Sequence, residues 1–232
     1  MRLPFKALAD GKAAYPSAPY VIPFAAFLLF LVLSDRAPAN PVWESPARVI
    51  AMGVICFYCW PQHCKLQVVA PVAGVVLGIA VFILWIAPDV LIPGYRNSVL
   101  FQNRFVGQVH SSISSATLQS WWVLGWRSIR AIVIVPVVEE LFWRAWLMRW
   151  LIRPDFESVP LGSYSAASFF IVAVLFGLEH GPYWDVGLLT GFIYNWWMIR
   201  TKSLADCILV HGVTNACLCG YVIWAGQWQY WQ

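Results

Sequence analysis

One run of the chain, residues 132–150, limits the possible folds more than any other. It reads IVIVPVVEELFWRAWLMRW and has the length of a membrane-spanning helix. It nevertheless contains two adjacent carboxylates, Glu139 and Glu140, with Arg144 one turn later. On insertion scales each such charge at a helix centre costs about 2.5–3.5 kcal/mol. The fold must therefore supply partners for these groups, or a function must justify burying them.

The spacing of the three charges separates the two glutamates. At about 100° per residue, Glu140 and Arg144 lie on one helix face and can pair, whereas Glu139 points about 100° away. An ionisable side chain in hydrocarbon without a local partner is by default a candidate functional group. We therefore expect a structural role for Glu140 and a free Glu139, the alternative being an ion-pair cluster that only locks the helices together.

The rest of the chain is typical of a membrane protein. Hydrophobic residues make up 60% of it and charged residues 11%, and the mean hydropathy is +0.66. This composition excludes a soluble domain and predicts an all-α, polytopic helical bundle in the lipid bilayer, with about seven transmembrane helices. The basic residues lie beside span ends and form no tract that could follow a nucleic acid. The expected spans are residues 20–33, 47–60, 68–86, 132–150, 164–180, 185–198 and 204–224.

Charge and polarity also predict the organisation along the chain. We interpret the first stretch as an uncleaved helix rather than a secretory signal, because no cleavage site follows residue 33. Residues 89–120 are too polar to cross a bilayer, which predicts a loop with a short interfacial helix between an accessory part, 1–117, and a catalytic core, 118–232. The distribution of Lys and Arg favours a cytoplasmic N-terminus. The expected location is a bacterial inner membrane, and nothing in the sequence indicates an oligomeric state.

A CxxC motif, Cys56 and Cys59, is followed by His63 and Cys64. Such spacing can hold zinc or form a redox pair. However, the motif lies inside an apolar run and no second CxxC completes a four-ligand site. We expect buried membrane thiols.

Three more polar residues fall inside or at the ends of the last expected spans: His180, His211 and Asn215. His211 and Asn215 are four residues apart, so they share one helix face. Singly, each is as typical of helix packing as of catalysis. Together with Glu139 they offer a carboxylate and an imidazole that can activate water, and donors for the oxyanion formed when water attacks an amide. This set indicates hydrolysis of an acyl bond within or beside the membrane.

Three short motifs carry a family resemblance. EELFWR fits the pattern EExxxR, FGLEH fits FxxxH and HGVTN fits HxxxN. Over about residues 121–224 the chain resembles the CPBP family of intramembrane (metallo)proteases, which includes the type II CAAX prenyl endopeptidases and bacteriocin-processing or immunity proteins. The N-terminal part is also similar to bacterial CAAX-protease-related proteins found alongside exosortase sorting systems.

The resemblance implies a role for each motif residue. Glu139 and His180 activate water, and His211 with Asn215 forms the oxyanion hole. Glu140 and Arg144 hold the site together. The implied substrate is a peptide or lipidated protein, cut near the membrane surface.

Other functions remain open at this stage. The same groups could form the polar core of a non-catalytic immunity or sorting scaffold, or Glu139 could be the proton site of a transporter, although no inverted repeat is visible. Two histidines and two glutamates could bind Zn²⁺, but no HExxH motif is present. We expect a site without metal or other cofactor.

Overall fold

The computed structural model describes residues 15–36, 39–61, 64–109 and 120–231. Within these residues the chain forms helices and no strand, which confirms the predicted all-α class. Seven long helical rods account for most of the described chain. They are α1 (Ala18–Arg36), α2 (Pro41–Cys59), α3 (Pro71–Leu91), the composite helix α5–α7 over residues 121–150, α8 (Ala166–Glu179), α9 (Trp184–Thr201) and α10 (Leu204–Ala225).

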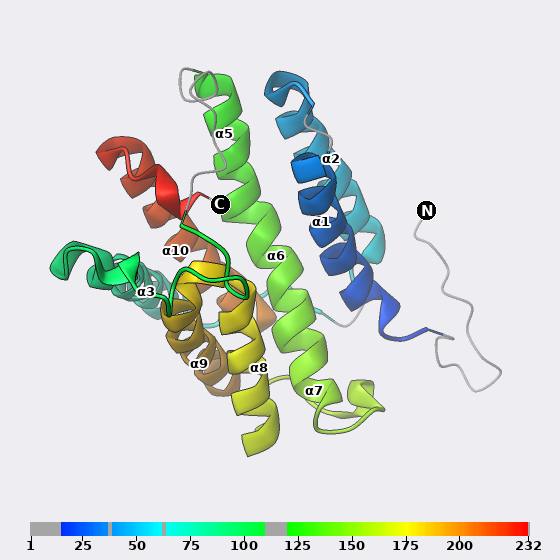
Figure 1. Cartoon of the computed structure of the whole chain (residues 1–232). Coiled ribbons are helices and arrows are strands. Elements are labelled where there is room, and N and C mark those ends of the chain that lie inside the picture. Colours follow the sequence, from blue (N-terminus) through cyan, green and yellow to red (C-terminus); the bar gives the residue numbers. More distant parts are fainter. Residues whose placement is uncertain (1–14, 37–38, 62–63, 110–119, 232) are drawn as a thin grey trace.

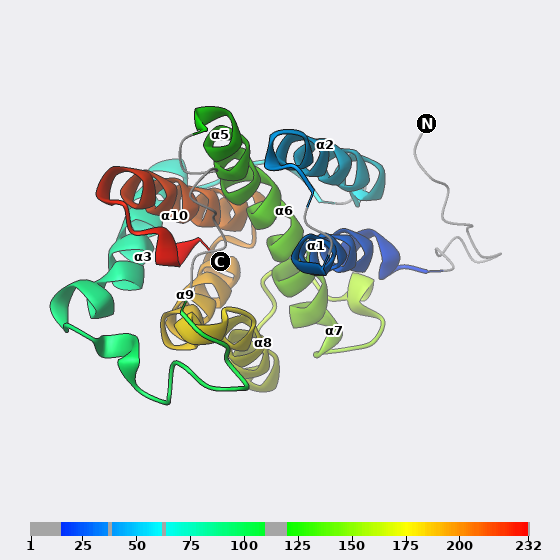
Figure 2. The same ribbon diagram turned by 45° about the horizontal axis from the view of Figure 1, so that its top comes forward.

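The composite helix α5–α7 is the centre of the bundle. In Figures 1 and 2, α1 and α2 lie on one side of it and α3 and α10 on the other. The hairpin of α8 and α9 packs across its lower half. Any polar group on α6 therefore faces helices from several directions rather than a single neighbour.

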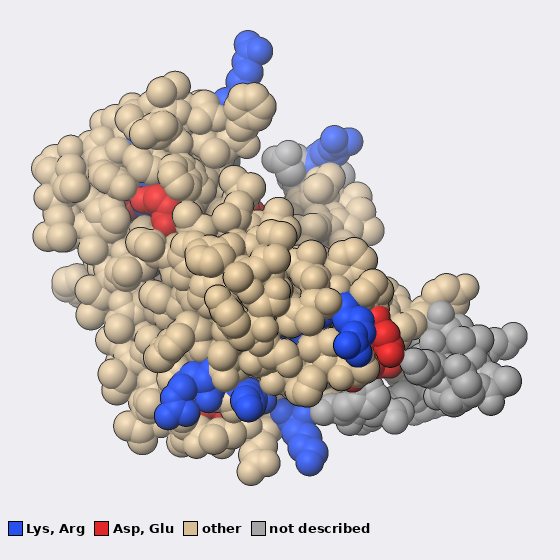
Figure 3. Space-filling model, turned by 90° about the horizontal axis from the view of Figure 1, so that it is seen from below, with Lys and Arg blue, Asp and Glu red and all other residues tan. Residues whose placement is uncertain are grey.

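Three described helices, α2, α3 and α10, are long and apolar enough to cross a membrane, and α1 and α8 contain shorter apolar stretches. The face of the molecule in Figure 3 is largely uncharged, with scattered Lys and Arg side chains. These features are those of an integral membrane protein. The expected crossing of the bilayer by α1, α5–α7, α8 and α9 stays a prediction.

The central helix differs from the regular α-helix expected over residues 132–150. It begins earlier, at Trp121, and two stretches of π-helix interrupt it, Arg130–Ile134 and Leu141–Leu147. Pro136 is the second residue after the first stretch, and its nitrogen carries no N–H that could donate to the carbonyl four residues before it. A wider turn absorbs this defect without ending the helix.

The N-terminal helices are longer than their sequence suggested. Pro41 occupies the first turn of α2, where its missing N–H is tolerated, and the Asn40 side chain accepts a 3.0 Å hydrogen bond from the amide of Val42. The helix therefore starts at residue 41 and not at 47. In the described part of the 89–120 segment, the expected interfacial helix is only a 3₁₀ turn, Tyr95–Asn97. The first fourteen residues, the SSISS stretch and the 117/118 boundary lie outside the described residues.

The N-terminal and C-terminal parts share one core. The Asp206 carboxylate in α10 accepts from the amides of Val69 and Ala70 at 2.7 and 2.8 Å, which fixes the chain entering α3. On the other side of the bundle, the rings of Phe24 in α1 and Phe142 in the central helix stack at 4.0 Å. The cysteines of the CxxC motif and Cys64 are free and buried, as predicted.

Close contact between α8 and α9 depends on glycine. A Cβ atom added at Gly191 would lie 2.9 Å from the Ala173 Cα and 3.0 Å from its carbonyl oxygen, and neither backbone atom can move aside cheaply. We expect Gly191→Ala to lower the free energy of unfolding by about 1–3 kcal/mol through overpacking, although alanine is the better helix former. Thermal unfolding in detergent measures this.

Gly220→Ala is the matched control for that substitution. A Cβ atom at Gly220, also inside a helix, would have no other atom within 4 Å. It should be neutral or slightly stabilising because only the helix propensity changes. Equal melting temperatures for both variants would contradict a role of Gly191 in helix packing.

Candidate active site

A cavity of about 1120 Å³ opens inside the bundle. It exceeds the usual size of a small-molecule pocket, about 300–1,000 Å³. Its wall includes all four residues that the sequence analysis assigned to catalysis: Glu139, His180, His211 and Asn215. The structure therefore brings together groups from α6, the end of α8 and α10.

The second glutamate, Glu140, is fully buried and held by two partners. Its Oε1 atom accepts from the Arg144 Nη1 at 3.2 Å and from the His211 Nδ1 at 2.9 Å. The first contact is the expected pair four residues apart. The second comes from another helix, so Glu140 ties α10 to the central helix. Because a carboxylate only accepts, the His211 Nδ1 must be the donor.

Arg144 is the largest fully buried side chain of the described residues. Its guanidinium lies 4.3 Å from the ring centroid of Phe176 and 5.4 Å from that of Tyr194. Two aromatic faces and one carboxylate thus replace the water around this charge. The result is a rigid support under the floor of the cavity.

Glu139 has a different environment. Its side chain is 5% exposed and lines the cavity, and its Oε2 atom has no hydrogen-bond partner among the described residues. It experiences the negative charges of Glu179 and Glu140 and the positive charge of Arg144. Of the two adjacent glutamates, Glu139 is therefore the one that remains available to a molecule in the cavity.

His180 caps the C-terminal end of α8, before the Gly181–Tyr183 turn. Its Nδ1 lies 2.6 Å from the carbonyl oxygen of Phe176 and must donate to it. The lone pair of the other ring nitrogen, Nε2, is then free to accept a proton. Gly187 of α9 approaches this side chain so closely that a Cβ there would lie 3.2 Å from the His180 Cβ and Cγ. Packing on two sides therefore fixes the ring.

Asn215 has a structural partner that the sequence did not reveal. Its Nδ2 donates at 2.8 Å to the carbonyl oxygen of Ala131, which lies in the first π-helical stretch. The amide of a side chain carries two N–H groups, so one remains for a ligand. The same residue can stabilise the widened turn and still face the cavity.

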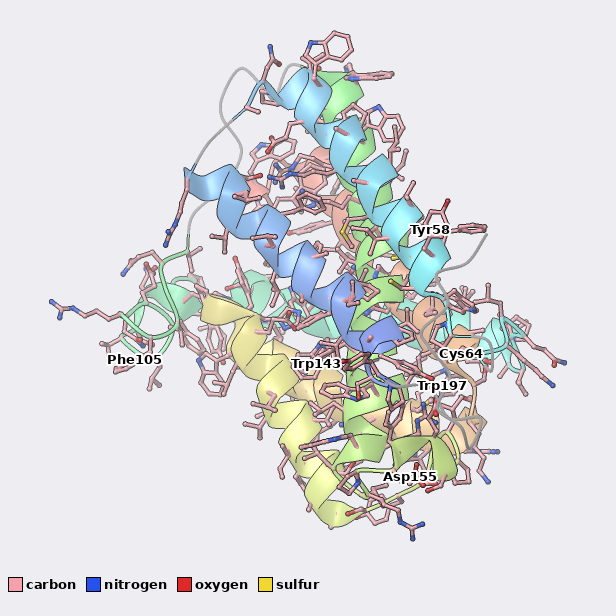
Figure 4. The ribbon with its side chains drawn as sticks, turned by 90° about the vertical axis from the view of Figure 1, so that its right-hand side faces the viewer. Tyr58, Cys64, Phe105, Trp143, Asp155 and Trp197 are labelled. Atoms are coloured by element: carbon pink, nitrogen blue, oxygen red, sulfur yellow. The ribbon has the colours of Figure 1, made fainter. Side chains whose placement is uncertain are left out.

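Two residues of the cavity wall escaped the sequence analysis as site residues. Glu179 places a second carboxylate beside Glu139, and its Oε2 accepts from the indole N–H of Trp143 at 3.1 Å. Trp143 lies near the middle of the bundle, between α1 and α8 (Figure 4). Tyr194 lines the cavity, and its ring centroid lies 5.3 Å from that of His211. Glu179 directly precedes His180, so an acidic residue next to the FxxxH histidine was the available signal.

Within the described residues, no group of three or more His, Cys, Asp and Glu side chains is arranged to hold a metal ion. Both site histidines also use Nδ1 in hydrogen bonds within the protein. The expected metal-free site stays a prediction.

Comparison with known proteins agrees with the geometry. Residues 119–217 match a family model described as type II CAAX prenyl endopeptidase, Rce1-like. This part of the chain is an Rce1-like domain. The matched region contains all four site residues, and the family that it resembles is described as one of CAAX prenyl endopeptidases. No curated protein and no solved structure matches the chain.

Proposed function

We propose that this protein is an intramembrane endopeptidase that hydrolyses a peptide bond inside the cavity. The observation that carries the proposal is the contrast between two adjacent glutamates. Glu140 accepts from Arg144 and His211 through its Oε1 atom and lies outside the cavity wall. Glu139 is buried and faces the cavity, and within the described residues no hydrogen bond or ion pair holds its carboxylate. A purely structural polar core would be expected to give each glutamate a partner.

In the proposed reaction Glu139 and His180 activate water. The Glu139 carboxylate and the free Nε2 of His180 are the two acceptors that can take a proton from a water molecule between them. The resulting hydroxide attacks the peptide carbonyl carbon. The abstracted proton is then delivered to the leaving amine as the C–N bond breaks, so one water yields one acid and one amine.

His211 and Asn215 would stabilise the oxyanion of the tetrahedral intermediate. Asn215 offers its second amide N–H, and the first remains on the Ala131 carbonyl. His211 donates from Nε2 only as an imidazolium, because its Nδ1–H is directed to Glu140. Glu140 orients the His211 ring, which gives it a part in the chemistry as well as in the support of the site.

The cavity wall also supports the class of substrate. Phe27, Leu28 and Leu31 of α1 form an apolar part of the same wall as the polar groups. A peptide with an apolar segment or a lipid chain could lie against α1 while its backbone reaches Glu139. The family implies a peptide or prenylated protein as substrate, and recognition of a prenyl group by this chain is part of the proposal.

His180→Asn tests the proposed base. The Asn side chain can keep a donor near the position of Nδ1 and so retain the bond to the Phe176 carbonyl, but it has no basic nitrogen in place of Nε2. We expect cleavage to fall by about 10²–10⁴-fold with the melting temperature unchanged. The measurement is mass spectrometry of a synthetic peptide library incubated with the purified protein in lipid nanodiscs. Full activity of this variant would exclude His180 as the base.

A further inference from the structure

A second carboxylate in the cavity wall, that of Glu179, has no part yet in the proposed reaction. Glu179 is the last residue of α8, directly before His180, and it lines the same cavity as Glu139. A negative charge at the C-terminal end of a helix opposes the helix dipole, so helix stability gives no reason for an acidic residue there. In a bundle of apolar helices such a group is a candidate for function.

The indole of Trp143 holds Glu179 close to Glu139. Its N–H donates to the Glu179 Oε2 at 3.1 Å, and Trp143 lies four residues after Glu139 on the central helix (Figure 4). The carboxylate of Glu179 is therefore anchored about one helical turn away from Glu139. Its negative charge acts on Glu139 more strongly than that of Glu140, although Glu140 is adjacent in the sequence. The two carboxylates thus form a pair across the contact between α8 and the central helix.

Within the described residues, no cation forms an ion pair with either member of this pair. The charge of Arg144 acts on both carboxylates, but its ion pair is with Glu140. The two site histidines direct Nδ1 to other acceptors, His180 to a backbone carbonyl oxygen and His211 to Glu140. Two carboxylates that lie close together without a cation of their own hold one proton between them. One of them is then a base and the other an acid.

Exposure distinguishes the two members of the pair. Glu139 is only 5% exposed and its Oε2 atom has no hydrogen-bond partner among the described residues, as expected of a group that waits for a ligand. Glu179 is an exposed residue of the same wall. The buried member can activate a water molecule that is shielded from bulk solvent. The exposed member can exchange its proton with solvent and is therefore suited to be the acid.

We propose that Glu179 is the general acid of the peptidase and donates a proton to the nitrogen of the departing amine. This inference rests on the proposed function, because it names the group that completes the same reaction. At rest Glu179 carries the proton of the pair and Glu139 is ionised. Glu139 takes a proton from water, and the hydroxide attacks the peptide carbonyl carbon. The proton of Glu179 passes to the nitrogen as the C–N bond breaks.

The pair then returns to its starting state. The proton that Glu139 took from water moves across to Glu179, either directly or through a water molecule. Over one cycle, a single water yields one carboxylic acid and one amine, and a single proton has passed in net terms from water to the amine. No further reactant is needed, because the pair gives and regains the same proton.

The experiment compares two leaving groups. The probe is a peptide that the wild-type protein cuts in the nanodisc assay, made once with the normal amide at the scissile bond and once with a thioester there. An amine must be protonated to leave, whereas a thiolate leaves without a proton. We expect Glu179→Gln to lower kcat/KM for the amide by about 10²-fold or more, and for the thioester by less than about threefold.

Three other variants separate an acid from a structural group. Glu139→Gln removes the base and should slow both substrates. Glu179→Asp keeps a carboxyl group and should recover part of the amide cleavage. Glu157→Gln, at an exposed glutamate outside the cavity wall, should change neither rate. Glu179→Gln itself keeps an oxygen that can accept from Trp143, so we expect an unchanged melting temperature.

Several results would overturn the proposal. Normal amide cleavage by Glu179→Gln would show that Glu179 donates no proton, and an equal loss for amide and thioester would make it a positioning residue. Either result would leave the peptidase itself standing. A wild-type protein that cuts neither probe nor library would instead reject the proposed function, and the acid role with it.

The shared proton has a test that needs no cleavage. Infrared difference spectroscopy of the protein in nanodiscs, with isotope-labelled glutamate to assign the band, detects protonated glutamate side chains at neutral pH. We expect one such band from the pair, lost in both Glu179→Gln and Glu139→Gln, because each variant leaves a single carboxylate without its like-charged partner. The absence of this band in the wild-type protein would overturn the proposal.

Discussion

Glu139→Gln is expected to abolish peptide cleavage while leaving the protein folded. The substitution keeps the size of the side chain but removes the carboxylate that would accept the proton from water. General-base catalysis contributes about 10²–10⁴-fold to a rate, and a loss of this size is expected in the nanodisc assay. The melting temperature should stay the same or rise, because an ionisable oxygen that lacks a partner is removed from a buried site.

Glu157→Gln is the matched control. Glu157 is an exposed glutamate in the 3₁₀ turn Phe156–Ser158 and is not among the residues that line the cavity. It should change neither cleavage nor melting. Full cleavage by Glu139→Gln would exclude Glu139 as the base, whereas a wild-type protein that cuts no peptide would favour the non-catalytic scaffold. A variant that fails to fold would show that Glu139 has a structural task which its contacts do not reveal.

Arg144→Ala should have the largest effect on stability. It removes the cation from the Glu140 carboxylate, leaves His211 as its remaining partner and opens a void beside Phe176. Breaking a buried ion pair from one side costs about 3–5 kcal/mol. For a chain of this length that corresponds to a fall of about 10 °C in the melting temperature. Arg153→Ala, at an exposed arginine, should shift it by less than about 2 °C.

A double variant separates the lost charge from the lost volume. Arg144→Met fills much of the space without a charge, and combining it with Glu140→Gln removes the opposite charge as well. The double variant should recover part of the stability lost by Arg144→Met alone, because no unpaired carboxylate remains. If the two effects simply add, the Glu140–Arg144 contact contributes little and packing explains the role of Arg144.

Much of the site was predictable because polar residues are conspicuous in apolar runs. The four-residue spacing of Glu140 and Arg144 gave their pairing, and the position of His180 before Gly-Pro gave the end of α8. Glu179 was overlooked because an acidic residue at a helix end needs no functional explanation. Its position beside Glu139 depends on how α8 packs against the central helix. That packing cannot be predicted from the few residues around Glu179.

The part of the cavity wall that carries Glu44, Arg48 and Arg127 was unpredictable for a different reason. The stretch that carries Glu44 and Arg48 contains three prolines and resembles a loop, yet two of them, Pro41 and Pro46, fall inside α2. Helix periodicity also gave no sign of the π-helical stretches. A π-turn holds one additional residue, which leaves no recognisable mark in the amino-acid composition. It also disturbs the hydrophobic pattern with a period of 3.6 residues too little to be noticed.

The first of these stretches, Arg130–Ile134, sets the angle about the helix axis between Arg127 and Glu139, which both line the cavity. A π-turn accommodates one residue more than the α-turn it replaces, so everything before it is rotated by about 100° relative to everything after it. Deleting one residue there would restore a regular helix and turn Arg127 away from the wall that Glu139 occupies. A single inserted residue in an ancestral helix would thus have been enough to bring a cation and a carboxylate to the same cavity.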